Sequence, residues 1–184
     1  MMRIISGKFK NRKLDSPKTM DVRPTSGRLR EALFNITQHY IEGADFLDLF
    51  AGSGAVGFEA LSRGAGSVCF VDSSRSSVRS IEKNISMLGV DDDAYVVDCD
   101  VLEFLPTHRG AYDIIYVDPP YQKGYSEKIL AMIDGSQLLK PDGVLFIEDS
   151  KDFDPVSVPL KQLVLVNSRR LGRSMLHQYK RAAV

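Results

Sequence analysis

The chain has 184 residues, of which 43% are hydrophobic and 26% are charged. These values fit one globular domain and exclude disordered, collagen-like and low-complexity proteins. The sequence has no apolar run of about 18 residues that could span a membrane, and its first residues lack the apolar core of a secretory signal. We therefore expect a soluble, cytoplasmic, monomeric protein without a membrane partner.

The charges cancel over the whole chain but are unevenly distributed. Residues 1–31 hold nine Lys or Arg against three acidic residues, and residues 161–184 hold six against none, so each end has a net charge of +6. The stretch 32–160 carries the compensating −12. Basic ends favour a polyanionic partner, because neutralisation of phosphates with counterion release dominates nucleic-acid affinity. On composition alone, ordinary solvated charge is an equally good explanation.

The cysteine and histidine residues are too scattered to indicate a metal site. Cys69 and Cys99 have no neighbouring Cys or His at ligand spacing, and His39, His108 and His177 are far apart in the sequence. Neither a zinc site nor a Ser-His-Asp triad is predicted, and both cysteines are interpreted as small buried apolar residues.

The N-terminal part is expected to be a small extension. Residues 3–14 are typical of short extended segments around Gly7 and Asn11, which would form a peripheral hairpin. Thr25 can cap a helix whose apolar positions recur at helical spacing, and Gly43 is expected to end it. We place a basic extension in residues 1–24 and the main domain in residues 25–184.

Strands and helices then alternate along the chain. Strands are expected at 46–50, 68–72, 94–97, 112–117 and 144–147, and helices at 55–63, 78–88 and 125–134. This alternation predicts an α/β fold with a doubly wound, mainly parallel sheet. The last two strands, 163–171 and 174–179, flank Gly172-Arg173, which fits a hairpin turn. The sheet is therefore predicted to end antiparallel.

A glycine-rich segment follows the first of these strands. The segment Gly52-Ser53-Gly54-Ala55-Val56-Gly57 fits the G-x-G-x-x-G fingerprint between a strand and a helix, where small residues let the backbone approach a nucleotide. In doubly wound sheets the ligand lies at the carboxyl ends of the strands. The fingerprint alone does not distinguish a dinucleotide from another adenosine cofactor.

Aspartates near the strand ends help to choose between these cofactors. Asp48 precedes Gly52 by four residues, where a carboxylate would oppose a pyrophosphate but suit a cationic group. S-adenosylmethionine has an amino group, a sulfonium and no phosphate, so it is favoured over NAD. Asp72 could accept the ribose hydroxyls of either cofactor, and Asp100, with Asp98 nearby, could accept the adenine amino group. Simple capping of the strand ends is the alternative for all of these acids.

The turn Asp118-Pro119-Pro120-Tyr121 follows the fourth strand. Prolines lack a backbone donor and fix φ, so the turn presents a rigid pair of acceptors, the Asp118 carboxylate and the Pro119 carbonyl. Such a pair could hold the two N–H groups of an exocyclic amine while its lone pair faces a methyl donor. The Tyr121 ring could stack on a base turned out of its helix. The alternative is an ordinary proline-containing loop.

Five motifs carry a resemblance to a known family. They are Arg3-Ile4-Ile5-Ser6-Gly7, Val22-Arg23-Pro24-Thr25, Arg30-Glu31-Ala32-Leu33-Phe34-Asn35, Asp48-Leu49-Phe50-Ala51-Gly52-Ser53-Gly54 and Asp118-Pro119-Pro120-Tyr121. With these motifs the chain resembles class I S-adenosylmethionine-dependent methyltransferases that methylate amino groups. Among them it most resembles the bacterial 16S ribosomal RNA guanine-N2 methyltransferases. The last two motifs are common to many amino methyltransferases, and the N-terminal ones are more specific to this family.

The resemblance implies a Rossmann-like, seven-stranded sheet with a reversed last hairpin, and methylation of the N2 of one guanine. It implies 16S rRNA in the small ribosomal subunit, or an assembly intermediate, as partner, with S-adenosylmethionine as cofactor and S-adenosylhomocysteine as product. The implied cofactor contacts are Asp48, Ala51, Gly52, Ser53, Gly54, Asp72, Asp100 and Val101. The implied catalytic residues are Asp118, Pro119, Pro120 and Tyr121. Cys99 stands where such enzymes often have Gly, which weakens the match at Asp100.

Side chains near both ends of the chain are the expected RNA contacts. The candidates are Lys8, Lys10, Arg12, Arg23, Thr25, Arg28, Arg30, Arg169, Arg170 and Arg173. Three other functions stay open on the sequence. The turn after the fourth strand would hold adenine N6 in DNA equally well, the glycine fingerprint permits a dehydrogenase, and a non-catalytic RNA-binding module could keep the fold.

Overall fold

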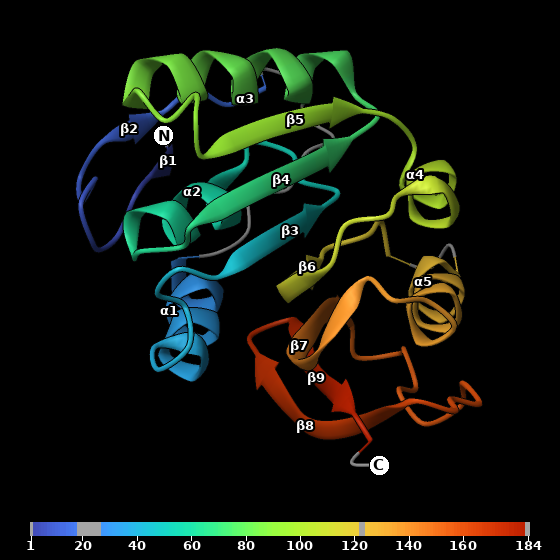
Figure 1. Ribbon diagram of the computed structural model, residues 1–184. Coiled ribbons are helices and arrows are strands. Elements are labelled where there is room, and N and C mark those ends of the chain that lie inside the picture. The colour runs from blue at the N-terminus through green and yellow to red at the C-terminus, as the bar shows by residue number, and fades with distance from the viewer. Residues whose placement is uncertain (1, 18–26, 122–123, 183–184) are drawn as a thin grey trace. The chain divides into compact units, whose positions relative to one another are not determined.

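The structure, a computed structural model, describes residues 2–17, 27–121 and 124–182 (Figure 1). These residues group into two compact units, Met1–Val101 and Leu102–Val184. The main sheet has seven strands, and a separate sheet has two.

The first unit contains three parallel strands with the order β5-β4-β3. They are β3 (Asp45–Leu49), β4 (Ser67–Asp72) and β5 (Ala94–Asp98). Helix α2 (Ala55–Ser62) connects β3 to β4, and α3 (Arg75–Leu88) connects β4 to β5. The apolar runs of β3 and β4 are almost completely buried, as expected for parallel strands covered on both faces.

Close packing of α2 on β4 depends on a glycine. A Cβ atom at Gly57 would overlap the ring of Phe70 and the side chain of Val68 in β4. Because glycine has no side chain, the helix can lie directly on the strand, which is the usual role of the third glycine in this fingerprint. All eight residues of α2 are buried.

The N-terminal hairpin of the same unit is present as expected. Strand β1 (Met2–Arg3) pairs antiparallel with β2 (Lys13–Leu14), and Asn11 in the connection has a φ of 68°. Helix α1 (Gly27–Thr37) ends before Gly43, which the sequence indicated as its end. The proposed cap Thr25 and the domain boundary expected between residues 24 and 25 lie outside the described residues.

Helix α4 (Val101–Thr107), which the sequence did not predict, starts at the last residue of the first unit and otherwise belongs to the second. Strand β6 (Tyr112–Val117) and strand β7 (Leu139–Ser150) are parallel, with helix α5 (Tyr125–Asp134) between them in the chain. Strand β7 starts five residues before the predicted 144–147. The pairing of this first part of β7 with β6 has a register irregularity between Tyr112 and Ile114. It includes Pro141, which has no backbone N–H to donate to a neighbouring strand.

The chain ends in the antiparallel hairpin that the sequence predicts. Strands β8 (Leu163–Leu171) and β9 (Ser174–Arg181) pair antiparallel, and β9 also pairs antiparallel with β7. The strand order in this unit is β6-β7-β9-β8. The predicted α/β class with a mainly parallel, seven-stranded sheet and a reversed end is therefore confirmed.

Candidate active site

The carboxyl ends of the three strands in the first unit lie at one edge of the sheet. Leu49 is in register with Val71, and Asp72 with Asp98, so the loops that follow these strands emerge side by side. These loops carry most of the predicted cofactor residues, namely Ala51, Gly52, Ser53, Gly54, Asp72, Asp100 and Val101. The structure thus brings these candidates to one place.

The loop after β3 turns sharply into α2. Phe50, Gly52 and Gly54 all adopt positive φ, at 58°, 56° and 72°. Gly54 is the N-cap of α2, and a Cβ atom there would overlap the Phe58 ring. Phe50 is not a glycine, so its conformation costs about 1–3 kcal/mol, and such strain is concentrated at ligand sites.

Asp72 holds this loop through its side chain. Its Oδ2 atom accepts a hydrogen bond from the Gly52 N–H at 2.8 Å, and its Oδ1 atom accepts one from the Ser74 N–H at 2.8 Å. The Gly52 donor, which a pyrophosphate would use in a dinucleotide site, is therefore occupied by a carboxylate. Each carboxylate oxygen has a further lone pair that can accept a ribose hydroxyl.

Asp48 lies beneath the loop and not at its surface. The residue is only 1% exposed, and its Oδ2 atom accepts a hydrogen bond from the Gly57 N–H at 3.0 Å. Burial raises the pKa of the Asp48 carboxyl to about 8, against the lowering effect of the Gly57 hydrogen bond, and the charge of Asp72 raises the pKa further. Direct contact between Asp48 and a cationic cofactor group stays a prediction.

The loop after β5 is joined to the end of β4. The Cys99 N–H donates to the Asp72 carbonyl at 3.2 Å, and the Cys99 Sγ lies 3.2 Å from the Asp100 carbonyl oxygen. Cys99 is half-buried, so a side chain fits at the position where related enzymes often have glycine. Asp100 is half-buried and Val101 is buried at the start of α4. Their contacts with adenine stay predictions.

The residues of these loops fit S-adenosylmethionine better than a dinucleotide such as NAD. Residues 50–54, 72–74 and 99–101 contain no Lys or Arg, and Asp48, Asp72 and Asp100 are acidic. The site therefore suits a ligand with hydroxyl groups and a positive charge, and it is unfavourable for a pyrophosphate. The residues present fit S-adenosylmethionine.

The second unit carries the Asp-Pro-Pro-Tyr turn directly after β6. Asp118 is half-buried, Pro119 is buried and Pro120 is exposed. The Tyr121 hydroxyl donates to Glu148 Oε1 at 3.1 Å and lies 2.9 Å from Ser174 Oγ. Burial raises the pKa of the Tyr121 hydroxyl, so it stays protonated and can donate at neutral pH. The ring is thus held at its hydroxyl end.

The structure divides the predicted RNA contacts into three groups. Seven of them are exposed, namely Lys8, Lys10, Arg12, Arg28, Arg169, Arg170 and Arg173. Arg23 and Thr25 lie outside the described residues. Arg30 is only 4% exposed, donates to the Arg3 carbonyl at 3.0 Å and forms an ion pair with Glu59 at 3.5 Å. We therefore correct the prediction for Arg30, which the structure places in the interior.

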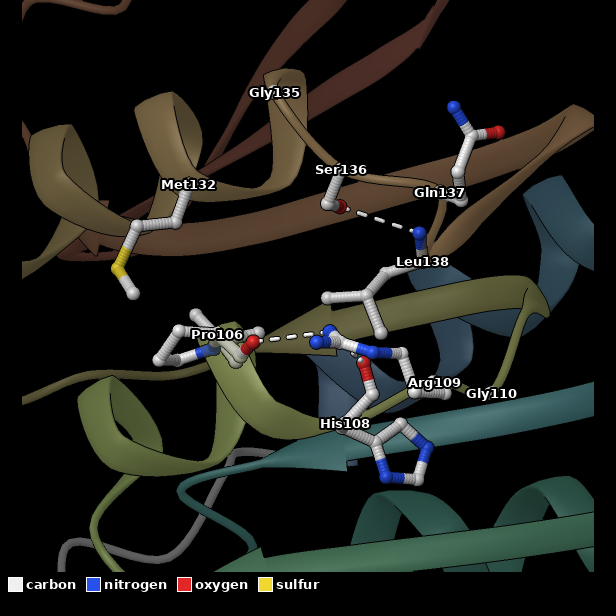
Figure 2. A pocket seen from close by; sticks show the side chains of 10 residues that line it. Pro106, His108, Arg109, Gly110, Met132, Gly135, Ser136, Gln137 and Leu138 are labelled. Atoms are coloured by element: carbon white, nitrogen blue, oxygen red, sulfur yellow. Dashed lines mark hydrogen bonds between the residues drawn. The ribbon is translucent and has the colours of Figure 1, made fainter.

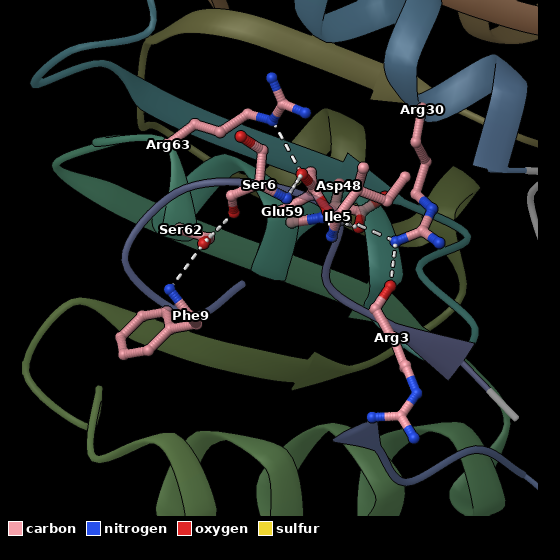
Figure 3. A network of polar contacts seen from close by, with 10 residues as sticks. Arg3, Ile5, Ser6, Phe9, Arg30, Asp48, Glu59, Ser62 and Arg63 are labelled. Atoms are coloured by element: carbon pink, nitrogen blue, oxygen red, sulfur yellow. Dashed lines mark hydrogen bonds and ion pairs between the residues drawn. The ribbon is translucent and has the colours of Figure 1, made fainter. Parts of the chain in front are cut away.

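A buried glutamate in α2 anchors the N-terminal hairpin (Figure 3). Glu59 is 0% exposed and accepts hydrogen bonds from the N–H groups of Ile5 and Ser6 at 2.8 and 2.9 Å. It also pairs with Arg63 at 2.8 Å. Ser62, one turn later, accepts from the Phe9 N–H at 2.9 Å. The hairpin that carries Lys8, Lys10 and Arg12 is thereby fixed to the helix that begins at the glycine loop.

Sequence reasoning missed Glu59 and Glu148. At Glu59 the signal was an isolated acid inside an otherwise apolar segment, and at Glu148 it was an acid directly after an apolar strand, since a buried carboxylate requires partners. The identity of those partners, which lie far away in the sequence, could not be deduced from spacing.

A pocket of about 340 Å³ lies at the opposite end of β6 from Asp118 (Figure 2). Its lining includes Pro106, Arg109, Met132 and Leu138.

Over residues 2–17, 27–121 and 124–182, no group of three His, Cys, Asp or Glu residues could hold a metal ion. In the same residues no helix is long and apolar enough to cross a membrane.

Three comparisons relate the chain to known proteins. Ribosomal RNA small subunit methyltransferase D of Haemophilus influenzae is 35% identical over 154 residues, which are 82% of this chain and 80% of that protein. The solved structure of yhhF from Escherichia coli has a TM-score of 0.89 and 32% identity, and the match covers 100% of this chain and 99% of that one. A structure solved in complex with S-adenosylhomocysteine shares the fold, with a TM-score of 0.67, 18% identity, and coverage of 94% of this chain and 52% of that one.

The sequence model of one family, described as conserved hypothetical protein 95, matches residues 2–180. This match spans nearly all of the chain, including the glycine loop and the Asp-Pro-Pro-Tyr turn. The resemblance expected from the motifs is confirmed. The chain belongs to the conserved hypothetical protein 95 family, and it is similar to ribosomal RNA small subunit methyltransferases.

Proposed function

We propose that this protein transfers a methyl group from S-adenosylmethionine to the exocyclic N2 of a guanine in 16S rRNA. The small ribosomal subunit, or an intermediate in its assembly, is the proposed substrate. The observation that carries the proposal is the Asp118-Pro119-Pro120-Tyr121 turn at the carboxyl end of β6, with the Tyr121 hydroxyl fixed by Glu148 and Ser174. Its similarity to small-subunit rRNA methyltransferases supports the choice of substrate.

The first unit would bind the methyl donor. S-adenosylmethionine supplies an electrophilic methyl group on a sulfonium. Asp72, which already orders the Gly52 loop, would accept the ribose hydroxyls, and Asp100 would accept the adenine amino group. A cationic ligand above the loop would lower the raised pKa of Asp48, so the carboxyl would lose its proton on binding and balance the charge of the ligand from beneath the loop. The occupied Gly52 donor argues against NAD as the ligand.

The second unit would bind the amine. The Asp118 carboxylate and the Pro119 carbonyl would accept the two N–H groups of the guanine N2, so that its lone pair points away from both acceptors. As the nitrogen forms its bond to the methyl carbon, the bond from that carbon to sulfur would break, with neutral S-adenosylhomocysteine as the leaving group. The nitrogen would become positive, and its proton would pass to the Asp118 carboxylate. No strong base is needed before this step, because the proton becomes acidic only during transfer. Asp118 and Pro119 would thus do the positioning on which the rate depends.

Recognition of the RNA would combine stacking and charge. The Tyr121 ring offers a face on which the extruded base can stack, worth about 1–3 kcal/mol. The exposed basic residues of the N-terminal hairpin, Lys8, Lys10 and Arg12, would bind phosphates, as would those of the β8–β9 hairpin, Arg169, Arg170 and Arg173.

Methyl transfer from tritiated S-adenosylmethionine tests this function. The acceptors are small ribosomal subunits from a strain that lacks the gene, free 16S rRNA and duplex DNA, and the labelled product is digested to nucleosides. We expect label in N2-methylguanosine from the ribosomal acceptors. Label in N6-methyladenine of DNA would favour the alternative substrate, and the absence of transfer to any acceptor would contradict the enzyme assignment.

A further inference from the structure

The Tyr121 hydroxyl lies between two strands of the second unit. Glu148, near the end of β7 and 4% exposed, accepts from Tyr121 at 3.1 Å through Oε1 and from Tyr116 at 2.7 Å through Oε2. Ser174, the first residue of β9 and 3% exposed, places its Oγ 2.9 Å from the Tyr121 oxygen. The end of the tyrosine side chain therefore contacts both β7 and β9.

Both contacts use the hydroxyl group that distinguishes tyrosine from phenylalanine. Stacking on a base needs only the ring face, which phenylalanine would offer equally well. A ring held only at its Cβ atom can still swing about χ1, whereas hydrogen bonds at the hydroxyl oxygen hold the far end of the ring in place. The oxygen lies on the χ2 axis, so these bonds act on the ring plane only because the O–H prefers to lie in that plane. Glu148 is only 4% exposed, so water competes little for its oxygens, and a hydrogen bond to a carboxylate is stronger than one to a neutral acceptor.

We propose that Glu148 and Ser174 are positioning residues that hold the Tyr121 ring in the orientation in which it receives the target base. This inference rests on the proposed function, since it assumes that Tyr121 stacks on the methylated base. It also gives the start of β9 a role, because Ser174 follows directly after the exposed Arg173 of the hairpin turn. A phosphate bound by Arg173 would therefore be held by the residue directly before Ser174, which contacts Tyr121.

The neighbouring residue of β7 has a separate task. Asp149, 7% exposed, accepts a hydrogen bond from Ser126 Oγ at 2.5 Å, and Ser126 is the second residue of α5. Successive residues of a strand point to opposite faces, so Asp149 cannot replace Glu148 at Tyr121. Removal of the Ser126 hydroxyl would disturb the start of α5 without releasing the Tyr121 ring, which makes Ser126→Ala a control for local disorder.

The test is steady-state methyl transfer to small ribosomal subunits, with kcat expressed per S-adenosylhomocysteine site found by calorimetric titration. We expect Tyr121→Phe and Glu148→Ala each to lower kcat about tenfold or more, because misplacement near the reacting atoms by about 1 Å can cost a hundredfold. The KM for the particle should change by less than about twofold, because phosphate contacts dominate affinity. Glu148→Gln keeps an acceptor and should recover most of kcat.

Tyr116→Phe is the matched control, because it removes the other tyrosine hydroxyl from the same carboxylate and leaves the Tyr121 contact in place. We expect this variant, like Ser126→Ala, to keep kcat within about twofold of the parent, since neither change misplaces the base. When Tyr121→Phe is already present, adding Glu148→Ala should lower kcat by no more than Tyr116→Phe lowers it in the parent protein. The reason is that the effects of two changes that break the same contact do not add.

The outcomes separate the two proposals. If the parent protein methylates the particle but Tyr121→Phe matches Tyr116→Phe, or if the effects of the Tyr121 and Glu148 changes multiply, the positioning role is wrong and the proposed function stands. If the parent protein transfers no methyl group to any ribosomal acceptor, the proposed function is wrong and the positioning role falls with it.

Discussion

The Asp72 carboxylate accepts a hydrogen bond from the Gly52 N–H at 2.8 Å and so links the end of β4 to the glycine loop that follows β3. The same carboxylate accepts from the Ser74 N–H at 2.8 Å. One side chain therefore orders two of the three loops at the edge of the sheet where the cofactor is expected.

Replacement of Asp72 by Ala should weaken cofactor binding. It removes the acceptor of both backbone donors and the proposed partner of the ribose, and hydrogen bonds to a charged group contribute about 1.5–3 kcal/mol each. We expect the Kd for S-adenosylhomocysteine, measured by calorimetry, to rise at least about tenfold, which is about 1.4 kcal/mol. Asp91→Ala, in the exposed turn before β5, is the matched control and should leave Kd nearly unchanged. If both changes raised Kd equally, Asp72 would have no specific role in cofactor binding.

The buried Asp48 should make stability depend on pH. Its pKa is raised by burial to about 8, above the value of about 4 expected in the unfolded chain, so the folded protein binds the proton more tightly. Between these two values the unfolded state holds fewer protons, and the free energy of unfolding therefore falls as pH rises, by at most about 1.4 kcal/mol per pH unit.

Asp48→Asn should remove this slope. Urea unfolding of both proteins at several pH values between 5 and 8 should show the parent losing stability relative to the variant. Asp92→Asn, on an exposed turn, is the control and should follow the parent. A constant difference between parent and Asp48→Asn over this range would mean that Asp48 is ionised in the folded protein.

Replacement of Glu59 should release the N-terminal hairpin. The change Glu59→Ala removes two backbone hydrogen bonds and leaves buried Arg30 without its ion-pair partner Glu59. Breaking a buried ion pair from one side costs about 3–5 kcal/mol. We expect a lower Tm and faster tryptic cleavage at Lys8, Lys10 and Arg12, followed by mass spectrometry. Glu82→Ala, exposed on α3, should change neither, and unchanged cleavage in Glu59→Ala would show that the hairpin is held by other contacts.

The exposed basic residues of the hairpin should determine part of the salt dependence of RNA binding. Combined replacement of Lys8, Lys10 and Arg12 by Ala should flatten the slope of log K against log salt by about 0.7–0.9 for each phosphate that is no longer neutralised. Binding to small ribosomal subunits can be followed by filter retention at several salt concentrations. Lys128→Ala, on the exposed face of α5, supplies the comparison. If the slope equalled that of Lys128→Ala, the three hairpin residues would make no phosphate contacts and would be ordinary surface charges.

The local patterns of the chain were sufficient for most of the fold. Strand β6 and helix α5 begin and end where apolar spacing predicts, because each pattern is long and is bounded by turn residues. Helix α4 was missed because it is short and contains Pro106. The early start of β7 was missed because Pro141 and Gly143 are typical of a turn, and the pairing of this part with β6 has a register irregularity.

The site was predictable where its chemistry is local in sequence. The glycine loop and the Asp-Pro-Pro-Tyr turn each carry their signal within a few residues. Arg30 illustrates the opposite case, because its charge favoured an RNA contact, whereas its partner Glu59 lies on a different helix. The anchoring of Tyr121 by Glu148 and Ser174 likewise depends on strand order, which spacing along the chain does not reveal.

The change Asp118→Ala removes the group that is proposed to hold the target amine and to accept its proton. The measurement is tritium transfer to small ribosomal subunits, paired with calorimetric binding of S-adenosylhomocysteine. We expect transfer to fall below detection while the Kd for S-adenosylhomocysteine stays close to that of the parent. Transfer by Asp118→Ala at the parent rate would contradict it.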